Sequence, residues 1–266
     1  MLQALVGRWL AGEDIDSAVA VCRRVNNSGL GALLNYIGED YKDKARVERS
    51  VETYQEVLGI IRSEGLRAGI SLKLTGIGLD IGKGYCLKNL LRILESSWGV
   101  VVWIDMEGPE HVQDTLELCG EAFSHYKNLA VTLQANLRRS KNDLLDILAR
   151  KGRVRLVKGA YKGDIRGWHE MEASFSWLMR ILFSRGNNFA IATNDEGLLE
   201  EAQELQARFN RDFEFQFLRG VGRKLKMKLA KEWPVSDYTP FGTDALPYLI
   251  RRGREQGLSV LWSLLG

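Results

Sequence analysis

Short apolar runs rich in β-branched residues recur along this chain, and most are followed by a helical pattern. Eight runs can be identified, spaced by about 30 residues as in repeated βα units, at 31–38, 70–76, 99–108, 129–136, 154–161, 188–195, 213–220 and 235–242. Strands that alternate with helices form parallel sheets, because parallel neighbours need a long crossover connection. Eight such units predict an α/β fold, a closed (β/α)8 TIM-type barrel.

Apolar residues spaced by three and four mark the helices between these runs. The clearest segment contains Val47, Val51, Tyr54, Leu58 and Ile61, and others cover 112–123, 144–149, 175–182, 198–209 and 225–230. A further helix over about 3–24 is expected to plug or flank the barrel. No linker rich in proline, glycine or serine interrupts the pattern, so residues 1–266 are predicted to form a single domain.

An open, doubly wound sheet is the rival architecture, and it usually carries a GxGxxG turn after its first strand. The nearest glycine cluster, Gly76, Gly78, Gly82 and Gly84, has the wrong spacing for that motif and for a phosphate-binding P-loop. We interpret it as a loop, and we prefer the closed barrel.

Composition excludes several classes of protein. With 45% hydrophobic residues the chain can bury a core, and three cysteines are too few for a disulfide framework or a zinc knuckle. His111, His125 and His169 lack ligand spacing, so no metal is expected. Arg8 and nearby acids argue against a signal peptide, which favours the cytoplasm. The net charge of 37 − 34 = +3 is too small to indicate nucleic acid as the partner.

Four polar residues interrupt the expected strands: Lys73, Asp105, Gln134 and Arg155. Each lies between apolar neighbours, so the two-residue period directs it into the barrel, toward the strand ends where such folds bind ligands. Burying an unpaired charge costs several kcal/mol, as an order of magnitude. These groups should therefore pair with a ligand or with one another, and an internal ion-pair layer of Lys73, Asp105 and Arg155 is the structural alternative.

Two further cationic segments stand out. Lys158 has the opposite parity to Arg155, so it should lie past the strand end, where with Gly159 and Ala160 it could meet a phosphate or an anionic ring edge. A surface lysine in a βα loop is the structural alternative. Tyr248, Arg251, Arg252 and Glu255 share one face of the last helix. Arginine binds carboxylates through two hydrogen bonds, so an anionic small molecule is plausible there, although a solvated basic face is the common alternative.

Taken in order, these segments resemble the flavin-dependent proline dehydrogenases over nearly the whole chain. The resemblance is carried by NYIGED, ISLKLTG, VWIDMEG, VTLQAN, VRLVKGAY, ATND, FEFQFLRG, YTPFG and the helix that begins at Tyr248. It implies a (β/α)8 barrel that binds FAD noncovalently and holds L-proline on one face of the flavin.

Residue roles follow from the resemblance. Asp105 and Arg155 are expected to act as catalytic residues, with Arg155 beside the flavin N5. Substrate contacts are expected from Lys73, Arg251, Arg252, Tyr238, Tyr248 and Leu218, and a further pocket wall from Tyr161. Cofactor contacts are expected from Met106, Gln134, Arg155, Lys158, Gly159, Ala160, Thr193 and Asn194. Glu39 resembles a gating acid that pairs with an arginine of the last helix.

One position departs from the family pattern, because Asn194 stands where a histidine is common. Asparagine can donate a hydrogen bond but carries no positive charge. The implied reaction oxidises proline to Δ1-pyrroline-5-carboxylate by hydride transfer to the flavin, and electrons then pass to a quinone-type acceptor. Since the substrate amine must be neutral to release hydride, activity should rise with pH. Peripheral contact with the inner face of a membrane and the oligomeric state are left open.

Two other functions are weighed. A Schiff-base lyase could use Lys73 or Lys158 as the strand-end lysine. A binding protein for nucleic acid or a membrane surface could use the basic residues Arg219, Arg223, Lys224, Lys226 and Lys228, although a solvated helix face explains these residues more simply.

Overall fold

The computed structural model describes residues 7–255, apart from the side chains at positions 251, 254 and 255. Eight parallel strands close into a barrel in which each strand pairs with its neighbours in sequence and β8 pairs with β1. The strands are β1 (Gly31–Tyr36), β2 (Ala68–Leu72), β3 (Val102–Ile104), β4 (Leu129–Gln134), β5 (Arg153–Val157), β6 (Phe189–Ala192), β7 (Phe213–Leu218) and β8 (Val235–Phe241). The predicted (β/α)8 fold is confirmed.

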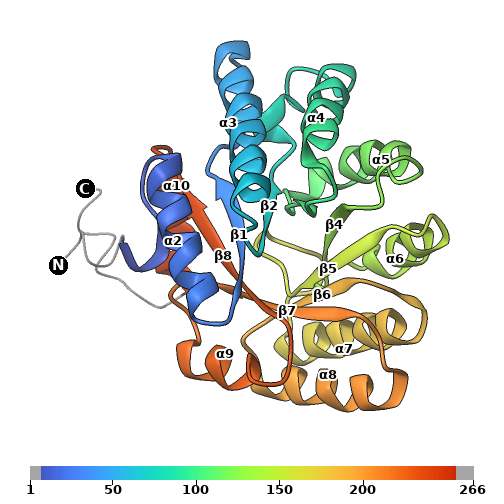
Figure 1. Ribbon diagram of the computed structural model, residues 1–266. Helices are drawn as coiled ribbons and strands as arrows, with labels where there is room; N and C mark the ends of the chain where they lie inside the picture. Colours follow the sequence, from blue (N-terminus) through green and yellow to red (C-terminus); the bar gives the residue numbers. More distant parts are fainter. Residues whose placement is uncertain (1–6, 256–266) are drawn as a thin grey trace.

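Helices surround this barrel (Figure 1). They are α2 (Ile15–Asn27), α3 (Lys44–Ser63), α4 (Lys83–Ser97), α5 (Val112–Ala122), α6 (Ser140–Ala149), α7 (Trp168–Arg185), α8 (Glu196–Phe209), α9 (Arg223–Leu229) and α10 (Leu246–Glu255), with short 3-10 turns at Thr75–Ile77 and Pro109–His111. Their apolar faces pack on the outward residues of the strands, and these two sets form one continuous core. The expected helices are therefore present, most of them longer than the sequence pattern predicts.

The predicted N-terminal helix over 3–24 is wrong in its bounds. Residues 1–6 lie outside the described residues, and α2 begins only at Ile15, where the Asp14 side chain accepts a hydrogen bond from Ser17 N. Residues 7–9 are also helical, but the chain leaves the helical conformation before α2 and runs beside the end of β8: Ala11 N donates to Pro240 O, and Gly12 O accepts from Gly242 N. Gly12 has a φ of +131°, a conformation that favours glycine and cannot continue a helix. The helix does flank the barrel, beside β1 and β8.

The glycine cluster near position 80 is not a simple loop. It forms the 3-10 turn at Thr75–Ile77 and the first residues of α4, a helix that the sequence reading did not identify. Gly76 is needed for close packing, since a Cβ there would lie 2.5 Å from the carbonyl oxygen of Gly38. The loops after β1 and β2 consequently lie directly against each other.

The interior of the barrel is filled by side chains. Leu33, Trp103, Ala130 and Ala190 form an apolar layer. The polar side chains of the strand ends lie close by, and the Arg155 guanidinium carbon is 5.4 Å from the centre of the Trp103 ring. This apolar layer gives the polar groups a dry and rigid support.

Candidate functional site

A cavity of about 560 Å³ opens at the carboxyl ends of the strands. It brings together most of the predicted site residues: Lys73, Asp105, Met106, Arg155, Lys158, Gly159, Ala160, Thr193, Asn194, Leu218, Tyr238, Tyr248 and Arg252 all line it. Segments that are far apart in sequence thus converge at one rim. This is the end of the barrel at which (β/α)8 proteins bind their ligands.

Asp105 is the centre of a buried polar cluster in this cavity. It follows the last residue of β3, and its backbone N–H donates to Leu72 O at 2.7 Å. One carboxylate oxygen accepts from Ser71 Oγ at 2.7 Å and pairs with Arg155, and the other accepts from Tyr238 Oη at 2.7 Å. Burial, with a smaller effect from the Asp105 charge, raises the pKa of Tyr238 well above its usual range. The phenol therefore remains a hydrogen-bond donor.

Arg155 lies almost fully buried across the barrel from Asp105. Its Nε donates to Thr132 Oγ1 at 2.9 Å, Nη2 donates to Ser71 Oγ at 3.1 Å, and Nη1 donates to Gln216 Oε1 at 3.3 Å. These acceptors lie on three different strands and together hold the guanidinium group in one orientation. The predicted internal layer of ion pairs is therefore partly present, because Arg155 pairs with Asp105. Both residues nevertheless line the open cavity.

Lys73 is not part of that pair. It lies one residue past β2, where its ammonium group pairs with Glu39 and donates to Tyr161 Oη at 2.7 Å. The Glu39 carboxylate thus neutralises one cation at the cavity mouth. The expected contact between Glu39 and an arginine of the last helix stays a prediction.

Lys158 lies directly after β5, as its parity predicts. Its ammonium group pairs with Asp195 at 2.7 Å and lies 3.9 Å from the centre of the Trp168 ring. Burial would raise the pKa of Asp195, but hydrogen bonds from Lys158 and the backbone of α8 outweigh it, so the pKa is lowered. The carboxylate therefore stays ionised and holds Lys158 at the rim.

Gly159 makes a sharp turn beside Lys158. Its φ is +130°, and a Cβ would lie 2.4 Å from the Asn136 side chain. The chain can therefore pass close to Asn136 only with glycine at this position. Asn136 in turn donates to Tyr161 O at 2.8 Å, which fixes the loop that carries Ala160. Thr193 and Asn194 face this loop from the end of β6 across the same cavity.

Gln134 is predicted to contact the cofactor, and in the structure its amide binds other parts of the protein. It is buried and does not belong to the lining of the main cavity. Its Nε2 donates to Glu107 O at 3.1 Å, and its Oε1 accepts from Ala160 N at 3.3 Å. Gln134 therefore ties the ends of β3 and β5 together, and a direct contact between Gln134 and a ligand stays a prediction.

Glu107 is a buried acid that the sequence reading missed. Its Oε1 accepts from Thr75 N at 3.0 Å and from Thr75 Oγ1 at 3.1 Å. Burial raises the pKa of Glu107 to about 7, against opposing effects of Lys73, Thr75 and His111. Its signal in the sequence was a second acidic residue in the run VWIDMEG, two residues after Asp105.

The last helix covers one side of the cavity. Tyr248 packs with Trp9, Leu10, Ile37 and Ala245 in a small apolar cluster that joins α10 to the N-terminal segment. Arg252 is buried, with its guanidinium carbon 5.7 Å from the centre of the Tyr248 ring, and both residues line the cavity. The backbone of Arg251 belongs to α10, but its side chain lies outside the described residues, so its predicted contact with a carboxylate is not tested.

Other residues of the lining were not predicted. They include Asn136, Ile165, Trp168, Met171, Gln216 and Val221. Gln216 could have been found, because it alternates with apolar residues in FEFQFL just as Arg155 does in its own strand. Trp168 and Met171 belong to the start of α7, and only the folded chain brings that helix to the rim.

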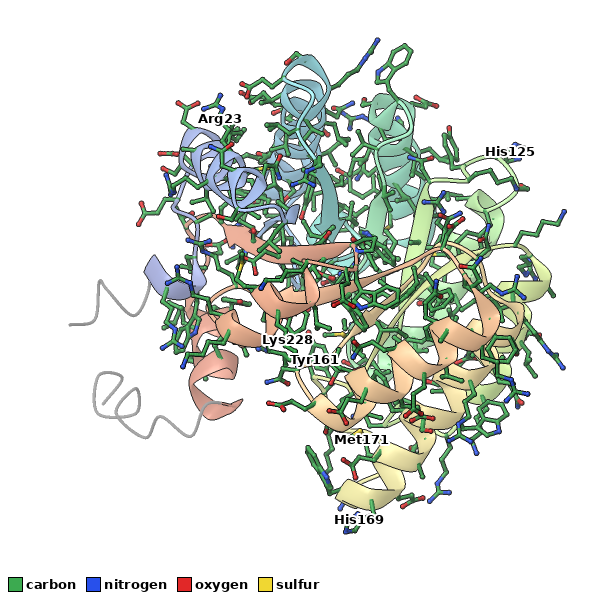
Figure 2. The ribbon with its side chains drawn as sticks, turned by 60° about the horizontal axis from the view of Figure 1, so that its bottom comes forward. Arg23, His125, Tyr161, His169, Met171 and Lys228 are labelled. Atoms are coloured by element: carbon green, nitrogen blue, oxygen red, sulfur yellow. The ribbon has the colours of Figure 1, made fainter. Side chains whose placement is uncertain are left out.

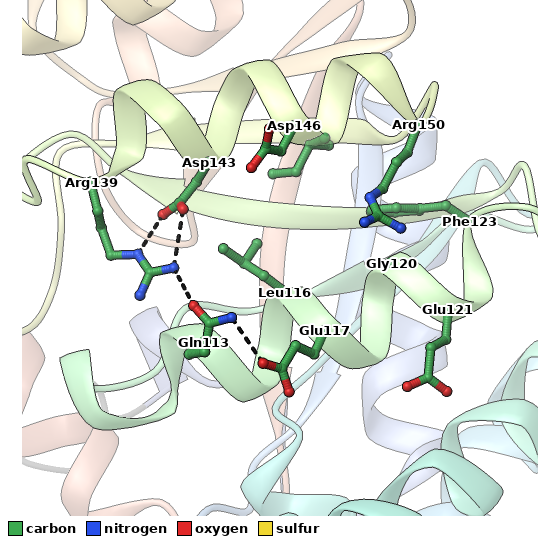
Figure 3. A pocket seen from close by; sticks show the side chains of 11 residues that line it. Gln113, Leu116, Glu117, Gly120, Glu121, Phe123, Arg139, Asp143, Asp146 and Arg150 are labelled. Atoms are coloured by element: carbon green, nitrogen blue, oxygen red, sulfur yellow. Dashed lines mark hydrogen bonds and ion pairs between the residues drawn. The ribbon is translucent and has the colours of Figure 1, made fainter.

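A second hollow lies on the outside of the barrel between α5 and α6 (Figure 3). It has a volume of about 440 Å³ and shares no lining residue with the cavity at the strand ends. Arg139 spans it by pairing with Asp143 and donating to Gln113 Oε1 at 2.7 Å. The hollow lies away from the carboxyl ends of the strands and none of the predicted site residues lines it, so we do not consider it the functional site.

The histidines do not form a site together. His125 and His169 lie on the surface and far apart (Figure 2). His111 is closer to acids than the sequence spacing suggests: with Asp40 and Asp80 it places ligand atoms within 4.8 Å of one another. Exposed carboxylates often gather in this way without a metal, and no further contact supports a cation there.

The basic residues after β7 do not form one exposed patch. Lys226 is buried and pairs with Asp237, which also lies 3.9 Å from Arg219. The expected basic surface therefore loses two of its five members, since Asp237, which projects outward from β8 toward α9, neutralises them. None of the helices within residues 7–255 combines the length and the apolar character that crossing a membrane requires.

The barrel and its cavity define the class of protein: a (β/α)8 barrel with a cavity, lined by several cations, at the carboxyl ends of its strands. The chain belongs to the proline dehydrogenase family, whose sequence profile matches residues 18–259.

Curated relatives agree with this assignment, and a solved structure agrees with the fold. The chain is 33% identical to proline dehydrogenase 1 of Bacillus subtilis strain 168, over 97% of this chain and 89% of that protein. It is 29% identical to proline dehydrogenase of Deinococcus radiodurans, over 94% of this chain and 86% of that protein. The crystal structure of proline utilization A from Bdellovibrio bacteriovorus matches 94% of this chain with a TM-score of 0.86 and 19% identity. The match covers 32% of that longer chain and supports the fold.

Proposed function

We propose that this protein oxidises L-proline to Δ1-pyrroline-5-carboxylate with FAD as its cofactor. The observation that carries the proposal is the convergence of Lys73, Arg155 and Arg252 on one cavity, together with the family. A small carboxylate substrate needs cations that fix its orientation, and a cavity rimmed by cations supplies them.

The residues of the rim fit FAD. Lys158 and the polar groups of Thr193 and Asn194 can bind a pyrophosphate, and Gly159, which lacks a side chain, lines the same part of the cavity. When bound, FAD would supply the chemistry of hydride acceptance. Arg155 would stabilise negative charge that develops on the ring, and Met106 would contact it from the end of β3.

The chain's own residues would orient proline. Lys73 and the arginines of α10, Arg251 and Arg252, would bind its carboxylate, which aims the ring carbon next to nitrogen. Tyr238, Tyr248 and Leu218 would form the walls and exclude water. Asp105 would hold Tyr238 and Arg155 in place through the contacts described above, and it would offset their surrounding positive charge.

The finer assignments are part of the same proposal. We infer a quinone-type electron acceptor, a cytoplasmic location with access to the inner face of a membrane, and a single domain over residues 1–266. A soluble quinone analogue should accept electrons from the proline-reduced protein.

One experiment tests the main claim. Proline is added anaerobically to the protein loaded with FAD, and the absorbance of the oxidised flavin is followed. We expect it to disappear with proline and to persist with prolinamide, which keeps the ring and amine but lacks the carboxylate. Persistence with proline would contradict the proposal.

The Schiff-base alternative has weaker support from the contacts. Lys73 and Lys158 both lie in ion pairs, and an ammonium group must lose its proton before it can attack a carbonyl. Borohydride trapping of a substrate on either lysine, without bound flavin, would favour that function instead.

A further inference from the structure

The barrel contains a buried acid, Glu214, for which the proposed mechanism has no use. It lies on β7 two residues before Gln216, so both side chains project inward while the phenylalanines between and beside them project outward. Glu214 Oε2 accepts from Ser236 Oγ at 2.5 Å, and Oε1 accepts from Gln216 Nε2 at 2.5 Å. Gly31 leaves room for this arrangement, because a Cβ there would lie 2.6 Å from Ser236 Oγ.

The bond to Glu214 sets the direction of the Gln216 amide. A carboxylate accepts hydrogen bonds, so it must face the NH2 group of Gln216. The amide oxygen then faces the opposite way and accepts from Arg155 Nη1 at 3.3 Å. With the amide reversed, its NH2 group would face the guanidinium, and two donors would oppose each other.

The amide oxygen of Gln216 is an acceptor for one particular nitrogen of Arg155, Nη1. The other described contacts of Arg155, to Thr132, Ser71 and Asp105, hold Nε and Nη2, whereas Nη1 has Gln216 as its acceptor among the described residues. Nη1 carries two hydrogens, so one remains for a group in the cavity. The guanidinium is rigid and planar, so the bond from Nη1 to Gln216 completes the orientation that the contacts of Nε and Nη2 begin.

We propose that Glu214 is a positioning residue of the site: acting through Gln216, it fixes the orientation in which Arg155 presents Nη1 to the cavity. This inference rests on the proposed function, because Arg155 is the residue assigned there to the flavin ring. It adds a residue that touches neither substrate nor cofactor.

The protonation state of Glu214 does not alter this role. Burial raises its pKa, while hydrogen bonds from Ser236 and Gln216 and the charge of Arg155 oppose the shift. A protonated carboxyl keeps an acceptor oxygen for the Gln216 amide, so the amide direction holds in both states.

The test uses a matched pair of substitutions in the protein loaded with FAD. Glu214→Gln keeps an acceptor oxygen, and Glu214→Met has nearly the same shape without a strong acceptor. Gln216→Met removes the link to Arg155 directly, and the double variant Glu214→Met/Gln216→Met completes a cycle.

Three quantities are measured for each variant: the rate of flavin reduction at saturating proline, the proline concentration for half-saturation, and the dissociation constant of FAD from flavin fluorescence. Loss of a hydrogen bond to a charged group predicts a reduction rate lower by about tenfold or more in Glu214→Met. FAD binding should weaken in the same variant, whereas half-saturation by proline should change by less than about threefold, because the carboxylate contacts lie elsewhere.

The pattern across variants decides the inference. Glu214→Gln should recover most of the rate, Gln216→Met should match Glu214→Met, and the double variant should be no slower than either. Additive losses, or equal losses in Glu214→Gln and Glu214→Met, would overturn the positioning role. If Glu214→Met does not fold, the comparison of Glu214→Gln with Gln216→Met decides: a fast Gln216→Met variant refutes the link. A wild-type protein that reduces no flavin with proline would refute the proposed function, and this inference with it.

Discussion

Tyr238 donates a 2.7 Å hydrogen bond to Asp105 across the end of the barrel, joining β8 to the residue that follows β3. The same carboxylate pairs with Arg155 on β5. Two residues that lie 50 and 133 positions from Asp105 in the sequence thus share this one acid. This carboxylate sets the charge balance of the cavity, because it offsets a buried guanidinium and fixes a phenol.

Substitution of Asp105 should therefore cost more than substitution of Tyr238. Asp105→Ala leaves a buried arginine unpaired and should lower the free energy of unfolding by about 3–5 kcal/mol. Tyr238→Phe loses one hydrogen bond and should cost about 1 kcal/mol. Urea unfolding at neutral pH measures both values, with Asp105→Asn as the variant that retains an acceptor for Tyr238. Equal costs for Asp105→Ala and Tyr238→Phe would contradict this picture of the cluster.

Arg252 should affect substrate more than cofactor. Removal of a charged hydrogen-bond donor from a carboxylate predicts that Arg252→Met raises the proline concentration for half-saturation by about 10–100-fold. The dissociation constant of FAD should change by less than about threefold if the guanidinium contacts only substrate. Steady-state kinetics and flavin fluorescence give the two quantities.

Arg223→Met, at an exposed position of α9, is the matched control for loss of one positive charge. It should leave both quantities near their wild-type values. A parallel loss of proline and FAD binding in Arg252→Met would assign this arginine to the cofactor.

Glu107 should make stability depend on pH. Its pKa is raised by burial from 4.5 to about 7 in the folded protein. Between these two values the unfolded chain releases the proton while the folded chain keeps it, so stability falls as the pH rises through this window and levels off above it. Relative to Glu107→Gln, which cannot titrate, the wild type should lose roughly 3 kcal/mol across this range. Urea titrations at a series of pH values measure the difference, and a constant difference would show that Glu107 ionises normally.

Turnover should rise from neutral to alkaline pH. Proline must lose the proton of its amine before hydride can leave, so the rate of flavin reduction at subsaturating proline should increase by about tenfold per pH unit where the amine is mostly protonated. Anaerobic stopped-flow absorbance measures this rate. FAD binding, followed at the same pH values, should stay level, and a flat rate profile would mean that deprotonation of the amine does not limit the reaction.

The fold could be predicted from sequence because its signal repeats. Each strand carries apolar residues on both faces, and each helix buries one stripe, so eight units give the same pattern eight times. The bounds of the predicted helices were less accurate where the backbone conformation of one residue decides them. Gly12, with its positive φ, interrupts the predicted N-terminal helix.

The alternation of side chains along each strand also predicted correctly that Asp105 and Arg155 point into the barrel. The same rule applied to FEFQFL would have found Glu214 and Gln216. It could not show that Gln134 satisfies both ends of its amide with Glu107 and Ala160, because those partners belong to other strands.

By itself, the sequence determined the closed barrel, the inward direction of its polar residues and the family, since burial periodicity and motif order are properties of neighbouring positions. The pairing of those residues was decided only in the tertiary structure. Lys226 illustrates the difference: in the sequence it belongs to a basic helix, and in the fold it is buried against Asp237. Charges find their partners through space, between elements that are not neighbours in the barrel or that lie in different layers, and the distance between two such side chains is fixed by how the barrel closes.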